Sequence, residues 1–284
     1  LSFSNFQIDV FSDSTMNILT QIIEHKRKEV AERKALYPVR LLEQSIYFQS
    51  PTVSLKKYIQ RPDKSGIIAE IKRKSPSRGV INGDVSVERI SLGYMQAGAS
   101  ALSVLTDKNF FGGSNEDLMI ARKFNFCPIL RKDFVVDEYQ LFEAKSIGAD
   151  AILLIAAVLS PLEIKNLAER ARDLKLEVLL EVHSREELDR SMDAEIDLVG
   201  VNNRNLQTFE MNVDLSRELA PHIPNKFVKV SESGIESPQA IVNLRKFGFQ
   251  GFLIGQTFMA QSRPGEAARQ FIAELNRIMD QTKL

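Results

Sequence analysis

The stretch GIIAEIKR, residues 66–73, is the first of eight short runs rich in apolar and β-branched side chains. The later runs are SALSVLTD (100–107), CPILRKDF (127–134), AILLIAA (151–157), EVLLEVHS (177–184), LVGVNNRN (198–205), FVKVSESG (227–234) and GFLIGQTF (251–258). Continuous apolar runs are typical of strands that are buried on both faces of a parallel sheet. Their starts lie 21 to 34 residues apart, which is the size of one strand, loop and helix.

The segments between the runs carry signals for the beginning and end of helices. Ser160 precedes a proline and has Glu163 three positions later, which is the spacing of a capping box. The same spacing recurs at 184–187, Ser237 and Pro238 open another segment, and three glycines stand where helices should end: Gly98, Gly148 and Gly248. We therefore predict an α/β fold, a single (β/α)8 barrel. An open, doubly wound sheet is the main alternative, although no G-x-G-x-x-G follows the first run.

Residues 17–36 precede these runs and place an apolar stripe opposite a charged face, which predicts an amphipathic helix. A second short amphipathic segment covers 54–59. The expected organisation is an N-terminal tail and helical extension at 1–60 and a catalytic barrel at 61–284. Residues 1–15 lack the pattern of a secretory signal, and no stretch approaches the 18 apolar residues of a membrane span.

The composition limits the classes of function. Of 284 residues, 44% are hydrophobic and 26% are charged, which is ordinary for a globular protein. Lys+Arg and Asp+Glu number 37 each, and the lack of a basic excess argues against a nucleic-acid partner. The single cysteine, Cys127, permits no internal disulfide and favours a cytoplasmic location, and its neighbours indicate a buried side chain. The three histidines (His25, His183, His222) show no metal-ligand spacing.

Polar side chains stand at the ends of five of the runs. They are Glu70, Lys72, Lys74 and Ser75; Arg131, Lys132 and Asp133; Glu181 and His183; Asn202, Asn203, Arg204 and Asn205; and Ser231, Glu232 and Ser233. In a barrel the carboxyl ends of the strands form the active-site face, so we expect these side chains to meet around one mouth. A structural layer of ion pairs is the alternative for any single pair.

These polar residues predict acid–base chemistry on an anionic substrate. Lys72 and Lys132 can act as acids if their pKa falls, or bind a carboxylate or phosphate if they stay charged. Glycines after the last two runs, Gly234 and Gly255, allow backbone N–H groups to approach a phosphate, unless they serve only as turn residues. Aromatic side chains that could cover a substrate ring, or pack in the core, are Phe110, Phe111 and Phe134.

Six motifs together resemble the indole-3-glycerol-phosphate synthase family. They are IIAEIKRKSPSRG (67–79), ILRKDFVVDEYQ (129–140), LLEVHSREEL (179–188), GVNNRNLQTF (200–209), VSESGI (230–235) and FLIGQTFM (252–259). The segment IIEHKRKEVAERK (22–34) also resembles the helical extension that precedes the barrel in this family. The resemblance covers about residues 17–279, and the combination of E-x-K-x-x-S-P-S, R-K-D-F and N-N-R-N-L is specific.

The resemblance implies a carboxy-lyase of tryptophan biosynthesis that needs no metal or organic cofactor. Its substrate would be 1-(2-carboxyphenylamino)-1-deoxyribulose 5-phosphate, and its products indole-3-glycerol phosphate, CO₂ and water. The implied catalytic residues are Lys132 as general acid, Lys72 as carboxylate ligand with a possible part in dehydration, Glu181 as general base, and Glu70 and Asn202 as orienting groups. The implied substrate-binding residues are Ser75 and Arg204 in the pocket, Glu232 at its rim, Phe111 and Phe134 at the ring, and Ser233, Gly234, Gly255 and Gln256 at the phosphate.

One position departs from the family pattern: Gln256 stands where many relatives have serine, so a backbone contact to phosphate would survive there and a hydroxyl contact would not. Two alternatives remain. One is another phosphate-binding barrel enzyme, an isomerase or a Schiff-base aldolase that uses Lys132. The other is a catalytically silent barrel that serves as a binding module. The expected partner is a phosphorylated small molecule, and the expected state is a monomer or weak homo-oligomer.

Overall fold

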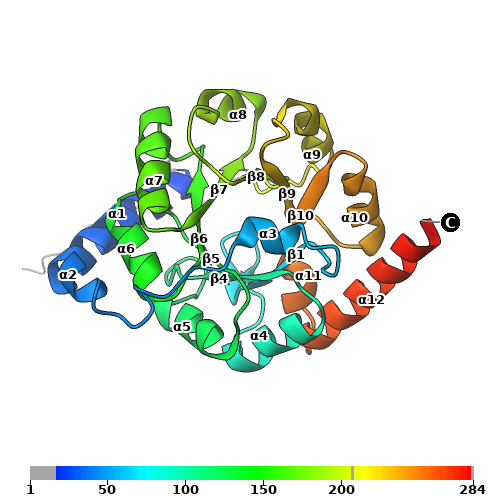
Figure 1. The fold of residues 1–284 in the computed structure, drawn as a ribbon, viewed down its shortest axis with the longest axis horizontal. Helices are drawn as coiled ribbons and strands as arrows, with labels where there is room; N and C mark the ends of the chain where they lie inside the picture. Colours follow the sequence, from blue (N-terminus) through cyan, green and yellow to red (C-terminus); the bar gives the residue numbers. More distant parts are fainter. Residues whose placement is uncertain (1–16, 206–207, 283–284) are drawn as a thin grey trace, which may run out of the picture.

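The computed structural model describes residues 17–205 and 208–282, and it shows eight parallel strands that close into a barrel (Figure 1). Around the barrel the order is β1-β10-β9-β8-β7-β6-β5-β4. The strands are β1 (Ile67–Ile71), β4 (Ala101–Leu105), β5 (Ile129–Lys132), β6 (Ala151–Ile155), β7 (Glu177–Val182), β8 (Leu198–Asn202), β9 (Val228–Glu232) and β10 (Phe249–Ile254). The predicted barrel is confirmed, and the open sheet is excluded because β1 pairs with both β4 and β10.

Helices surround the barrel between consecutive strands, and the whole ring is visible in Figure 1. They are α4 (Val87–Gln96), α5 (Asn115–Phe124), α6 (Tyr139–Ser146), α7 (Pro161–Asp173), α8 (Arg185–Ser191), α9 (Asp214–Leu219) with the 3-10 turn η1 (Ala220–His222), α10 (Pro238–Arg245), α11 (Gln256–Met259) and α12 (Pro264–Thr282). All five residues of β1 are buried, as expected for a strand covered on both faces.

The boundary signals act largely as the sequence predicts. Ser160 and Glu163 form a complete capping box at the start of α7. Ser184 caps α8 by accepting from the backbone N–H of Glu187, but the Glu187 carboxylate accepts from the His183 N–H (2.7 Å) instead of closing the box. The three predicted helix-ending glycines, Gly98, Gly148 and Gly248, all have positive φ.

Two local features differ from the sequence-based expectation. The last run was expected to be a strand over 251–258, yet β10 begins at Phe249 and ends at Ile254, and residues 256–259 form helix α11. The loop after β1 contains a two-stranded hairpin of β2 (Lys74–Ser75) and β3 (Gly79–Val80). Strands of two residues are too short to leave a periodic pattern in the sequence.

The N-terminal extension reaches both ends of the barrel. Helix α1 (Ile18–Leu36) reaches the end where the strands terminate, because Ile18, Leu19 and Ile22 line the cavity there. After the short helix α2 (Val39–Leu42), helix α3 (Leu55–Ile59) lies across the middle of the barrel in Figure 1. Leu55 and Ile59 of α3 are buried in the inner core cluster with residues at the strand beginnings.

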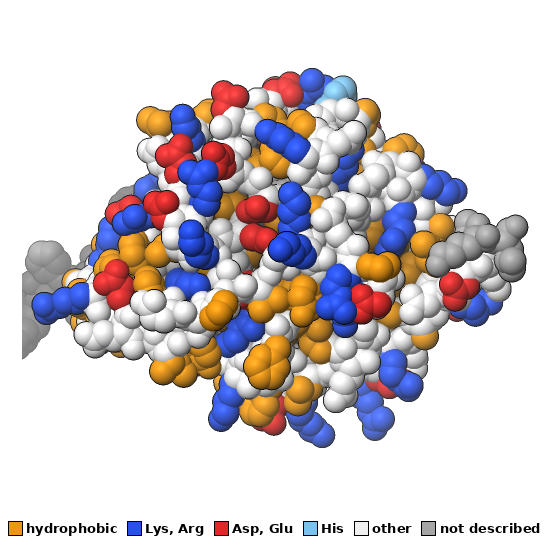
Figure 2. All heavy atoms as spheres, viewed as in Figure 1, with side chains coloured by type: hydrophobic (Ala, Val, Ile, Leu, Met, Phe, Trp, Pro, Cys, Tyr) orange, Lys and Arg blue, Asp and Glu red, His pale blue; other side chains and the backbone are white. Residues whose placement is uncertain are grey.

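The barrel is therefore closed at its amino end by α3 and open at its carboxyl end, which confines a site to the carboxyl end. Figure 2 shows the same side as Figure 1, where Lys, Arg, Asp and Glu side chains are mixed over the surface without a large patch of one sign. Within residues 17–205 and 208–282, no helix has both the length and the apolar character needed to cross a membrane. The tail at 1–15, judged above not to be a secretory signal, lies outside the described residues.

Candidate active site

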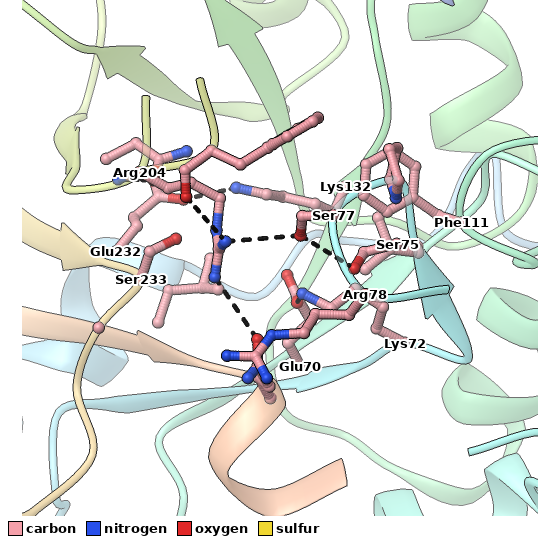
Figure 3. A pocket seen from close by; sticks show the side chains of 18 of the residues that line it. Glu70, Lys72, Ser75, Ser77, Arg78, Phe111, Lys132, Arg204, Glu232 and Ser233 are labelled. Atoms are coloured by element: carbon pink, nitrogen blue, oxygen red, sulfur yellow. Dashed lines mark hydrogen bonds and ion pairs between the residues drawn. The ribbon is translucent and has the colours of Figure 1, made fainter. Parts of the chain in front are cut away.

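A cavity of about 390 Å³ opens at the carboxyl ends of the strands, and all fourteen predicted site residues line it (Figure 3). From β1 and its loop come Glu70, Lys72 and Ser75; from β5 and the segments beside it come Phe111, Lys132 and Phe134. From β7 and β8 come Glu181, Asn202 and Arg204, and from the last two strands come Glu232, Ser233, Gly234, Gly255 and Gln256. The residues thus meet in one place, while their individual roles remain predictions.

Lys132 forms the centre of this cavity. Its Nζ lies 2.9 Å from Oε2 of Glu181 and 2.5 Å from Oε2 of Glu232. Burial alone would lower the pKa of Lys132, but the charges of Glu181 and Glu232 outweigh burial and raise it. The free protein therefore holds Lys132 as an ammonium, which is the form that a general acid requires.

The two carboxylates beside Lys132 differ in proton affinity. Burial opposes the charge of Glu181, yet Lys132 and His183 hold the pKa of that carboxyl well below its usual range. Burial and the charge of Glu181 raise the pKa of Glu232 to about 7, against the opposing effect of Lys132. A pair of carboxyls whose pKa values are pushed apart provides a base and a neutral partner in one site.

The expected place of Glu232 at the rim is wrong. This side chain is 1% exposed and reaches Lys132 in the barrel interior, since its strand position points it inward. A Cβ on Gly200 of the neighbouring strand would lie 2.2 Å from Oε1 of Glu232. Likewise, a Cβ on Gly255 would lie 2.4 Å from Oε1 of Glu70, whose Oε1 pairs with Lys72 Nζ at 2.7 Å. Each inner carboxylate therefore occupies space that a neighbouring strand leaves empty at a glycine.

Strand β5 separates its charged residues between two faces. Lys132 points into the cavity, whereas Arg131 lies outside it and pairs with Asp133 (3.1 Å) and Glu143 (2.5 Å). The expectation that all polar strand ends share the mouth is therefore wrong for Arg131, because side chains alternate along a strand. The structural ion-pair alternative describes Arg131 and its partner Asp133, although Asp133 also borders the cavity, and the functional interpretation applies to Lys132.

The Arg131 network continues into helix α1 through a lysine that the sequence analysis did not single out. Lys26 is fully buried, and its Nζ lies 3.0 Å from carboxylate oxygens of Glu29, Asp107 and Asp133. Burial would lower the pKa of Lys26, but Asp133, Asp107 and Glu29 raise it. Lys26 thereby ties α1 to the ends of β4 and β5 beside the cavity.

Two arginines lie at the mouth of the cavity, and the sequence analysis predicted only one of them, Arg204. Arg204 donates to Ser77 Oγ (3.4 Å) and to Gln256 Oε1 (3.5 Å), as the dashed lines in Figure 3 show. Burial and the nearby Arg78 lower the pKa of Arg204. Ser77 and Arg78 also line the cavity, and their only sequence signal was their place in the S-P-S-R motif after β1. Two guanidinium groups close to one another favour an anionic ligand.

The backbone beside these arginines is shaped for close approach. Ser233 and Gly234 both have left-handed conformations, with φ values of 67° and 73°. A Cβ on Gly234 would lie 2.6 Å from Met211 Cε, the terminal methyl of a flexible side chain, so the positive φ is the main reason for glycine at this position. Consecutive backbone amides in such a conformation form a concave binding place for an anion.

Two of the three predicted phenylalanines face the cavity. The rings of Phe111 and Phe134 lie with centroids 5.9 Å apart and an interplanar angle of 40°, and both line the cavity beside Leu19 and Ile22 of α1. Phe110 instead makes an edge contact with His25 and is not part of the lining. Asp107 accepts from the backbone N–H groups of Phe110 (2.7 Å) and Phe111 (3.2 Å), which fixes this turn.

Cys127 lies away from this site. It is a buried free thiol, and burial raises its pKa to about 12, which agrees with a packing role. Among the described residues, no group of three or more His, Cys, Asp or Glu is arranged to hold a metal ion.

Comparison with known proteins identifies the family. Among solved structures, one described as native KDPGal superposes with a TM-score of 0.57 at 14% identity, covering 79% of this chain and 100% of the other. Thiamine phosphate pyrophosphorylase from Pyrococcus furiosus gives a TM-score of 0.57 at 16% identity over 80% of this chain and 98% of the other. At such identities these similarities establish the barrel fold alone.

Sequence relatives are much closer. A protein named indole-3-glycerol phosphate synthase from Bacteroides thetaiotaomicron is 49% identical over 256 residues, 90% of this chain and 98% of the relative. Relatives of the same name from Campylobacter jejuni (40% identity; 90% and 100% coverage) and Acidithiobacillus ferrooxidans (41%; 88% and 97%) are also similar. The family model described as indole-3-glycerol phosphate synthase matches residues 19–271. The chain belongs to the indole-3-glycerol phosphate synthase family.

Proposed function

We propose that this cavity converts 1-(2-carboxyphenylamino)-1-deoxyribulose 5-phosphate into indole-3-glycerol phosphate, CO₂ and water, as a carboxy-lyase of tryptophan biosynthesis. The family membership supports this activity. The observation that carries the mechanism is the position of Lys132 between Glu181 and Glu232, inside a cavity that also holds cations and aromatic rings.

Ring closure would use Lys132 as the general acid. As the aromatic carbon attacks the ketone carbon, the Lys132 ammonium gives a proton to the ketone oxygen, which becomes a hydroxyl. Burial makes this ammonium depend on Glu181 and Glu232 for its stability, so protonation of Glu232 weakens its hold on the proton. Lys72, which pairs with Glu70, would bind the substrate carboxylate until it leaves as CO₂.

Dehydration would use Glu181 as the general base. After CO₂ has left, Glu181 accepts a proton from the ring intermediate, and a lysine ammonium gives a proton to the new hydroxyl, which then departs as water. Loss of the Lys132 proton in the first stage removes one of the cations that lower the pKa of Glu181, and Glu181 becomes a better base. Asn202 lines the cavity near this pair and is proposed to orient the substrate.

Binding of the substrate would use the rest of the lining. The phosphate is proposed to contact the backbone at Ser233, Gly234, Gly255 and Gln256, with Arg204 and Arg78 supplying positive charge. Phe111 and Phe134 would enclose the aromatic ring, with Ser75 beside them.

The proposed partner is this phosphorylated small molecule rather than a nucleic acid, and the proposed state is a monomer or weak homo-oligomer. We also propose a cytoplasmic location, which the single, buried free thiol Cys127 favours. Light scattering coupled to size exclusion tests the oligomeric state, and a stable large assembly would contradict the proposal.

The activity can be tested directly, since the chain contains no tryptophan and the product contains an indole. Adding the substrate should produce indole emission at a rate proportional to enzyme concentration. In E181Q the emission should rise about 10²-fold more slowly, with accumulation of the cyclised intermediate in a quench experiment. Absence of emission from folded wild-type protein would reject the proposed function. A stable adduct at Lys132 after borohydride reduction would favour a Schiff-base enzyme.

A further inference from the structure

His183 occupies a place that the proposed mechanism leaves unexplained. It follows β7 directly, two residues beyond Glu181, and its side chain is 11% exposed. Its Nε2 lies 3.4 Å from Oε1 of Glu181, and its Nδ1 lies 3.3 Å from Oε2 of Glu187 on α8. The same Glu187 oxygen accepts from the backbone N–H of His183 at 2.7 Å, so Glu187 is itself held in place.

We propose that His183 is a positioning residue, which as an imidazolium braced by Glu187 holds Glu181 ionised and directed at Lys132 and the substrate. This inference rests on the proposed role of Glu181 as the base. The two oxygens of Glu181 then have separate partners, Oε2 with Lys132 and Oε1 with His183. Lys132 changes charge during the reaction, whereas His183 keeps its charge and its contact throughout.

The charged surroundings agree with an imidazolium at this place. Burial alone would lower the pKa of His183, but Glu181 and Glu187 raise it to about 9. Lys132 from β5 and Glu232 from β9 face Glu181 from the other side, and Glu187 is the charged group that faces His183 from α8. At neutral pH these four side chains therefore alternate in charge, with Glu187 negative, His183 positive, Glu181 negative and Lys132 positive.

A pH profile separates this role from a merely structural one. In H183Q the cation is lost while an amide donor remains, so the pKa of Glu181 should rise and the acidic limb of kcat should move to higher pH. On that limb the variant should be about tenfold slower than the wild type, with full recovery of rate near pH 8. A uniform loss across the pH range, or an unmoved limb in a folded variant, would overturn the proposal.

Imidazole titration by NMR gives a second readout that needs no turnover. The chain has three histidines, and H183Q assigns the signal of His183. Its midpoint should lie near pH 9 in the wild type and fall towards 6.5 in both E187Q and E181Q. E186Q is the matched control, because it removes the same charge from the same turn of α8 at an exposed position and should leave the midpoint unchanged.

These outcomes separate the two levels of inference. Wild-type protein without turnover, but with a His183 midpoint near 9 that depends on Glu181, would reject the proposed function and retain the ion pair. Suppose instead that turnover is normal, and that the His183 midpoint lies near pH 6.5 and does not change in E181Q or E187Q. That result would reject the positioning role and retain the proposed function. If H183Q does not fold, H25Q and H222Q assign the His183 signal by elimination among the three histidines, and the E187Q titration then decides whether the imidazolium exists.

Discussion

Lys26 and Lys132 are both surrounded by carboxylates, but only Lys132 is exposed to the cavity. Each ammonium lies within 3.0 Å of carboxylate oxygens, and both owe a raised pKa to those carboxylates. The side chain of Lys26 is 1% exposed and surrounded by protein, whereas that of Lys132 is 13% exposed and lines the cavity. A buried charge network therefore marks catalysis only where a substrate can reach it.

The two networks are separated by the alternation of a single strand. Arg131 and Lys132 are neighbours in sequence, yet one joins the network of Lys26 and the other joins Glu181 and Glu232. The first network is expected to serve stability and the position of α1, and the second is expected to serve chemistry. The substitutions below test that division.

The largest effect is expected for K132A. Loss of the proposed general acid should reduce kcat by about 10²–10⁴-fold, as is typical for such groups. The folding free energy should change little, because Glu181 and Glu232 border a cavity in which water or a proton can replace the ammonium. Indole emission and urea unfolding measure the two quantities, with the exposed Lys165 changed to alanine as control. Normal turnover by K132A would contradict the assignment of Lys132 to the chemistry.

K26M should show the opposite profile. Removing this ammonium leaves Asp107 and Asp133 charged and buried, which should cost about 3–5 kcal/mol in the free energy of unfolding. Because α1 then detaches more easily from the cavity, KM should rise while kcat of bound substrate changes little. K28M, on the exposed side of the same helix, is the matched control in urea titrations. A stable K26M with a collapsed kcat would place Lys26 in the chemistry instead.

E232Q sharpens the comparison within the catalytic network. With the pKa of Glu232 raised to about 7, its carboxyl ionises as pH rises through neutrality and then holds the Lys132 proton more tightly. We expect kcat/KM of the wild type to fall a few-fold through this range for that reason. The amide of E232Q stays neutral, so this fall should be absent from its pH profile. A fall of equal size in both proteins would exclude Glu232 as its cause.

Q256S should have the smallest effect. If the backbone at this position makes the phosphate contact, a serine hydroxyl adds at most one hydrogen bond and should change KM by less than about tenfold. Substrate titrations measure the KM of Q256S, and F110L serves as the control because Phe110 lies outside the cavity lining. A larger change in Q256S would mean that the Gln256 side chain, through its contact with Arg204, shapes the phosphate site.

Much of the site was predictable because strand ends in a barrel must converge. The eight runs set the strand order, and the segments at the carboxyl ends of β1, β4, β5, β7, β8, β9 and β10 supplied every predicted residue that lines the cavity. The depth of Glu232 was missed because it depends on the strand register against Gly200. The burial of Lys26 was missed because two of its three partners, Asp107 and Asp133, lie about 80 to 110 positions away, and sequence periodicity records only local neighbours.

The glycines opposite Glu70 and Glu232 have a consequence for protein design. At Gly200 and Gly255, each inner carboxylate fills the volume that a neighbouring side chain would take. A designer who introduces this site into another barrel must therefore introduce each carboxylate together with the glycine on the neighbouring strand. A graft that copies only the acidic residues would force them out of place against the new scaffold's side chains.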